Sequence, residues 1–119
     1  VPVSKIPDFI GQANAAIEKA FPGTRIVAFG HVGDGNVHYD VLQPVGGDGD
    51  AHEAQREAGA EIIHDITAGF GGSISAEHGL GAMKTAEALT YKDPIEVAAL
   101  RAIRRALDPK RIMNPRVLF

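Results

Sequence analysis

Apolar residues recur at three- and four-residue steps in three stretches of the chain, and this spacing predicts three helices. Ser4, Asp50 and Asp93 stand at the starts of these stretches and are residue types that cap helices. Glu53 and Glu96 follow two of the caps by three residues and complete capping-box patterns. The predicted helices span residues 4–20, 50–69 and 93–107, and a fourth is expected over 79–89. One face of the last helix is lined by Ile95, Ala99, Leu100, Ile103 and Leu107.

Two segments with β-strand character flank a turn cluster, which predicts a β-hairpin. The first strand is expected over residues 24–31, a four-residue turn over 33–36, and the returning strand over 37–43. Residues 73–76 are expected to form a further short extended stretch. Helices combined with a small antiparallel sheet indicate the α+β class, with the helices packed on one face of the sheet.

Composition narrows the class of protein. A chain of 119 residues is long enough for one compact domain but not for two. The hydrophobic fraction of 45%, the charged fraction of 23% and the net charge of −3 are ordinary for a globular protein, and no basic stripe indicates nucleic-acid binding. No apolar run approaches the ~18 residues that would span a bilayer. Because cysteine is absent, a metal site would have to use His, Asp or Glu.

The hairpin carries two histidines beside its turn. A four-residue turn places His31 opposite His38, with Phe29, Asp40 and Leu42 on the same face. Directly opposed side chains have Cβ atoms about 5 Å apart, which would allow two imidazoles to bind one divalent ion. Histidines next to a turn are also common as plain surface residues, so the spacing is compatible with either role.

A Glu-His pair follows the predicted extended stretch, at a junction where functional groups are often presented. In an extended segment Glu77 and His78 would point in opposite directions and would therefore suit two different roles. Glu77 could be a third metal ligand, and His78 could act as an acid or base. The alternative is that the charge of Glu77 stabilises the start of the next helix and that His78 is solvated.

Three segments, taken in order, resemble the C-terminal domain of FAD-linked oxidases. This family includes D-lactate dehydrogenases, D-2-hydroxyglutarate dehydrogenases and the flavin subunit of glycolate oxidase. The resemblance covers about residues 25–119 and is carried by Phe29-Gly30-His31-Val32-Gly33-Asp34-Gly35-Asn36-Val37-His38, by Ser75-Ala76-Glu77-His78-Gly79-Leu80-Gly81 with Lys84, and by Leu107-Asp108-Pro109-Lys110-Arg111-Ile112-Met113-Asn114-Pro115.

The resemblance implies a ferredoxin-like cap domain that covers a flavin, with residues 1–119 as a single C-terminal fragment of it. It implies a divalent metal, usually zinc, held by His31, His38 and Glu77, with His78 as the general base and Asn114 near the FAD. The parent enzyme would oxidise a D-2-hydroxy acid to a 2-oxo acid and pass a hydride to FAD, which the FAD-binding domain of the same parent chain would bind.

The sequence departs from the family pattern at two positions, and other functions are also compatible with it. Asp40 stands where many hydroxy-acid enzymes of the family have Asn, and Arg116 stands where Gly usually follows Asn-Pro. The chain is expected to be the last quarter or so of a cytoplasmic enzyme, which could be peripheral to the inner membrane, and to be inactive by itself. Self-association of such a fragment is a further hypothesis. The competing functions are a stand-alone metal- or ligand-binding module without redox activity and a small metallohydrolase with His78 as its base.

Overall fold

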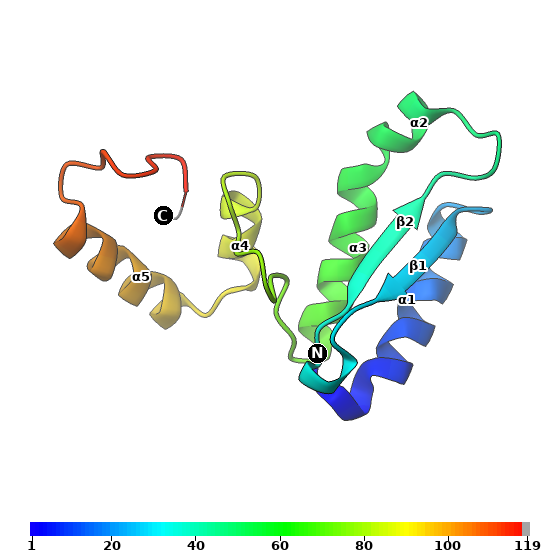
Figure 1. Cartoon of the computed structure of the whole chain (residues 1–119), viewed down its shortest axis with the longest axis horizontal. Coiled ribbons are helices and arrows are strands. Elements are labelled where there is room, and N and C mark those ends of the chain that lie inside the picture. The colour runs from blue at the N-terminus through cyan, green and yellow to red at the C-terminus, as the bar shows by residue number, and fades with distance from the viewer. Residues whose placement is uncertain (118–119) are drawn as a thin grey trace. The chain divides into compact units, whose positions relative to one another are not determined.

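The computed structural model describes residues 1–117 and divides the chain into two compact units, Val1–Ser73 and a second that begins at Ile74 (Figure 1). The described residues contain helices and one two-stranded antiparallel sheet, so the predicted α+β class is confirmed. The ferredoxin-like arrangement and the single-domain organisation stay predictions. No helix within residues 1–117 has both the length and the apolar character needed to cross a membrane.

The first unit packs two long helices beside a hairpin (Figure 1). Its helices are η1 Val3–Lys5, α1 Ile6–Ala20, α2 Gly49–Ala54 and α3 Arg56–Gly69, and its strands are β1 Arg25–Phe29 and β2 His38–Leu42. Helix α1 buries its apolar residues at the spacing that the sequence predicts, and Ala13 and Ile17 are completely covered. α3 runs alongside α1, so the core of this unit lies between the two helices and the hairpin.

Two predicted helix starts in this unit are wrong. Ser4 lies inside η1, and α1 has no side-chain cap. Asp48 rather than Asp50 caps α2, and its Oδ1 accepts hydrogen bonds from the backbone N of Asp50 at 2.9 Å and of Ala51 at 3.4 Å. Asp48 has the extended backbone that a capping residue needs, whereas Asp50 is already helical. The helix expected over 50–69 is also interrupted, at Gln55.

The hairpin forms, but the predicted four-residue turn is wrong. Phe29 lies opposite His38 and Val27 lies opposite Asp40, so residues 30–37 connect the strands. This connection contains a short 3-10 helix, η2 Val32–Asp34, which ends β1 two residues earlier than expected. A two-residue shift keeps side chains on their predicted faces, since strand faces alternate with period two. Phe29, His38, Asp40 and Leu42 therefore share one face, while His31 lies outside the ladder.

Tyr39 joins the opposite face of the hairpin to α1. Its ring meets the ring of Phe9 edge-on with centroids 6.2 Å apart, and its hydroxyl donates a hydrogen bond to Asn14 Oδ1 at 2.7 Å. Phe9 in turn packs edge-on against Phe70 at the end of α3. These aromatic contacts leave the face that carries His38 on the side away from α1.

Burial raises the pKa of Tyr39 to about 12, and this predicts a late titration step. Because the folded pKa lies above the unfolded value of about 10, neutral Tyr39 stabilises the fold fully below pH 10 and progressively less as the pH rises through 12. Tyr39→Phe should remove a tyrosinate absorbance step near pH 12, while Tyr91, the second of the two tyrosines, serves as the internal control. An unchanged titration curve in Tyr39→Phe would contradict the assignment.

The second unit contains helices α4 Thr85–Tyr91 and α5 Pro94–Leu107. The predicted cap of α5 is confirmed, because Asp93 Oδ1 accepts a hydrogen bond from the backbone N of Ile95 at 2.7 Å. The helix expected from residue 79 starts only at Thr85. Gly79 and Gly81 have φ values of 67° and 58°, which a right-handed helix cannot contain, and this explains the late start.

Candidate functional site

His38 begins strand β2, and its imidazole is held against an aromatic ring. The rings of Phe29 and His38 are stacked with centroids 5.0 Å apart and planes 13° from parallel. The stacking follows from the register, because these two residues are direct cross-strand partners. Asp40, two residues further along β2, lies on the same face and is exposed. This face of the hairpin thus combines an oriented imidazole with a carboxylate.

His31 sits in the connection between the strands instead of opposite His38. Its carbonyl oxygen accepts hydrogen bonds from the backbone N of Asp34 at 2.9 Å and of Asn36 at 3.2 Å, which close the turn around η2. Gly30, just before it, has a φ of 143°, and a Cβ there would lie 2.6 Å from the carbonyl oxygen of Asn36. The hairpin register therefore does not form the facing histidine pair that the sequence predicts, and Phe29 takes the position expected for His31.

Gly30→Ala should destabilise the first unit by about 1–3 kcal/mol, because it adds a backbone clash to a backbone conformation that L-residues rarely adopt. Gly33→Ala is the matched control in the same connection, since a Cβ there has no neighbour within 4 Å. Urea unfolding of the two variants tests this. Equal urea midpoints for the two variants would show that the close approach of the backbone at Gly30 does not affect stability.

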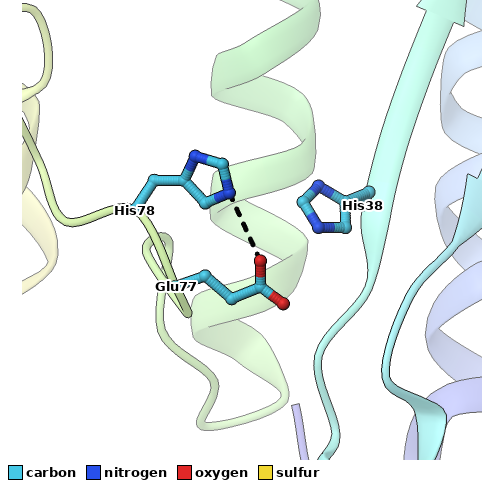
Figure 2. Close-up of side chains that lie close together, drawn as sticks. All are labelled: His38, Glu77 and His78. Carbon is cyan, nitrogen blue, oxygen red and sulfur yellow. Dashed lines mark ion pairs between the residues drawn. The ribbon is translucent and has the colours of Figure 1, made fainter.

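Glu77 and His78 lie beside each other in the second unit. His78 Nε2 is 3.3 Å from Glu77 Oε2, and the dashed line in Figure 2 marks this ion pair. The expectation that the two side chains point in opposite directions is wrong, because residues 76–78 form a bend and residues 73–76 contain no strand. A carboxylate against one ring nitrogen orients an imidazole and selects its tautomer. Glu77 and His78 thus form a close pair, with the His78 side chain 80% exposed and that of Glu77 30% exposed.

Asn114 lies in the segment after α5, whose backbone is held by two charged side chains. The Arg104 guanidinium donates hydrogen bonds to the carbonyl oxygens of Met113 at 3.3 Å and of Asn114 at 3.0 Å. The Asp108 carboxylate accepts hydrogen bonds from the backbone N of Ile112 at 3.0 Å and of Met113 at 2.9 Å. Asn114 has a φ of 44°, a left-handed conformation that Asn adopts more readily than most residues. The segment is thus preformed around Asn114.

Sequence reasoning missed Arg104 and Asp108 as the residues that hold this segment. Asp108 was placed only in the third resembling segment, without a role in holding it, yet the residue is buried, with 7% exposure. The sequence offered one indication of this role, an Asp-Pro step directly after a helix. An Asp side chain at such a position can accept hydrogen bonds from the backbone N–H groups that follow it. Arg104 had no signal of its own, because it resembles the other arginines of an amphipathic helix.

Comparisons with known proteins identify the family. The family described as "FAD linked oxidases, C-terminal domain" matches residues 1–118. The chain is 35% identical over 119 residues to a D-2-hydroxyglutarate dehydrogenase of Xanthomonas citri, covering 100% of this chain and 25% of that protein. It is 35% identical over 117 residues to the mitochondrial D-2-hydroxyglutarate dehydrogenase of Bos taurus, covering 97% of this chain and 20% of that one.

A third relative is named for a different activity. The chain is 34% identical over 115 residues to a D-lactate dehydrogenase of Archaeoglobus fulgidus, covering 97% of this chain and 24% of that protein. The chain thus spans about a quarter of the length of these curated relatives. It belongs to the C-terminal domain family of FAD linked oxidases.

Proposed function

We propose that this member of the FAD linked oxidase family is the substrate-side portion of a longer flavin-dependent dehydrogenase, which oxidises a D-2-hydroxy acid to a 2-oxo acid. The observation that carries the proposal is the family match over residues 1–118, shared with relatives named as D-2-hydroxyglutarate and D-lactate dehydrogenases. The FAD-binding domain of the same parent chain would be its partner. The ferredoxin-like cap fold belongs to the same proposal.

The proposed ligands of this chain are of types that suit a divalent metal. Two imidazoles and one carboxylate, from His31, His38 and Glu77, are the ligand types that zinc prefers in catalytic sites. Asn114 is proposed to lie near FAD, in a segment whose backbone Arg104 and Asp108 hold. When bound, the metal would lower the pKa of the substrate hydroxyl and the flavin would accept the hydride.

The residues of this chain would bind, orient and deprotonate the substrate. Stacking on Phe29 restricts the His38 imidazole to one plane, which reduces the entropy lost when it binds a ligand. His78 would take the hydroxyl proton on its ring, and the carboxylate of Glu77 would keep that ring in place. Because a carboxylate has two oxygens, Glu77 can hold His78 with one and serve the metal with the other.

Anaerobic mixing of the whole natural polypeptide with 2-hydroxy acids tests the proposal. The D-enantiomers of lactate and 2-hydroxyglutarate should bleach the absorbance of oxidised flavin, whereas the matched L-enantiomers should not. The 2-oxo acid should appear in equal amount to the reduced flavin. Failure of every D-2-hydroxy acid tried to bleach a fully flavin-loaded polypeptide would rule the proposal out.

A further inference from the structure

Asp40 lies beside the proposed metal ligand His38 on one face of the hairpin. The two residues are two positions apart on β2, so their side chains leave the strand on the same side, about 7 Å apart. Phe29 holds the His38 ring by stacking, and Val27 is the cross-strand partner of Asp40. A molecule bound at His38 would therefore lie close to the Asp40 carboxylate.

The Asp40 carboxylate has no structural partner within residues 1–117. The residue is exposed, its side chain forms no hydrogen bond or ion pair in this part of the chain, and the side chain opposite it is apolar. Because no cation pairs with this carboxylate, its negative charge acts on whatever binds nearby. Contacts within the fold therefore give no reason for a carboxylate at this position.

Arg25 is a cation on the same hairpin face, but it lies further from His38. It pairs across the strands with Leu42, four residues along β2 from His38, which corresponds to about 13 Å. Its Nε also donates a hydrogen bond to the carbonyl oxygen of Gln43 at 3.2 Å. Since physiological salt screens exposed charges beyond about 8 Å, Asp40 dominates the field next to His38 on this face.

We propose that Asp40 is a specificity-determining residue, whose carboxylate selects 2-hydroxy acids with one carboxylate over those with two. The inference rests on the proposed function, since the substrate must bind beside His38 as proposed there. It goes further by naming a substrate class that the relatives leave open. 2-Hydroxyglutarate, in the names of two of them, carries two carboxylates, whereas lactate, in the name of a third, carries one.

Coulomb repulsion sets the size of the expected preference. The first carboxylate is common to both substrate classes, so its interaction with Asp40 cancels when they are compared. The second carboxylate adds one unit charge. At about 7 Å, its repulsion by Asp40 corresponds to about 3-fold at the dielectric constant of water and to about 50-fold at an effective value of about 20 near a protein surface.

Two substrates of the same shape test the proposal in the whole natural polypeptide loaded with flavin. D-2-hydroxy-5-methylhexanoate carries two methyl groups where D-2-hydroxyglutarate carries the two oxygens of its second carboxylate. We expect kcat/KM to favour the methyl compound, and Asp40→Asn to lower this preference by about 3- to 50-fold. Calorimetric titration with the two corresponding 2-oxo acids should show the same change in relative affinity without turnover.

Asp8→Asn is the matched control, because it removes the same charge from an exposed position on α1. That helix packs against the opposite face of the hairpin, through the contact of Phe9 with Tyr39. The preference between the two substrates should therefore stay unchanged in Asp8→Asn, and the metal content should stay unchanged in both variants.

An unchanged preference in Asp40→Asn, or a natural polypeptide that prefers the dicarboxylate, would overturn the proposal. An equal change in Asp8→Asn would assign the effect to net charge, and loss of metal from Asp40→Asn would make Asp40 a metal ligand instead. If no D-2-hydroxy acid reduces the flavin, the proposed function fails and this inference falls with it. Turnover with an unchanged preference in Asp40→Asn would reject this inference alone.

Discussion

His38→Ala should strip the divalent metal from the whole natural polypeptide and lower its kcat/KM by at least about 100-fold. Removing groups that merely support a metal ligand costs about 10–100-fold in affinity or activity, so the loss of a ligand should cost no less. Metal content and kcat/KM should fall together, because the proposed metal both binds the substrate and polarises it. Elemental analysis of the purified variant and steady-state kinetics with a D-2-hydroxy acid measure the two losses.

His52→Ala is the control for a histidine that has another role in the same unit. The His52 ring lies 3.1 Å from the carbonyl oxygen of Val41, a contact that ties α2 to the hairpin. Its loss should leave the metal content unchanged. If His38→Ala keeps a full complement of metal while His52→Ala behaves as expected, His38 is not a ligand. The metal content of His31→Ala, measured in the same way, tests whether a histidine outside the strand ladder is also a metal ligand.

The elements of the fold were predictable where local chemistry decides them. Asp93 followed by Pro94 is a local pattern, and it caps α5 as predicted. The alternation of side chains placed His38 and Asp40 on one face, and that survived an error in the register because the error was an even number of residues. The register itself was not predictable, since it depends on η2 and on the close approach of Gly30 to Asn36 across the connection.

The candidate site shows the same division between local pattern and three-dimensional contact. The motif around Glu77 and His78 was visible in the sequence, but the bend that brings the two side chains within 3.3 Å was not. Likewise, spacing identified the apolar face of α5 without saying whether anything within the chain covers it. Helical spacing predicts which face of a helix is apolar, but it does not determine whether that face is covered.

His78→Gln should lower kcat by about 100- to 10,000-fold, the range expected when a general acid–base group is removed. Glutamine keeps a polar side chain of similar length that can still donate to Glu77, so the bend should survive while proton transfer is lost. Metal content and KM should stay close to their original values, because His78 is proposed to move a proton and not to bind the metal. Steady-state kinetics and elemental analysis of the same preparation separate these effects.

Glu77→Gln gives the contrasting pattern that makes the test of His78 specific. Removal of the carboxylate charge should reduce metal content together with kcat, because Glu77 is proposed to serve both the metal and the His78 ring. A His78→Gln variant that loses metal to the same extent would make His78 a ligand and leave the base unassigned. A His78→Gln variant that turns over at the original rate would show that His78 does not take the proton. Glu77, which lies 3.3 Å from His78, would then be the next candidate for the base.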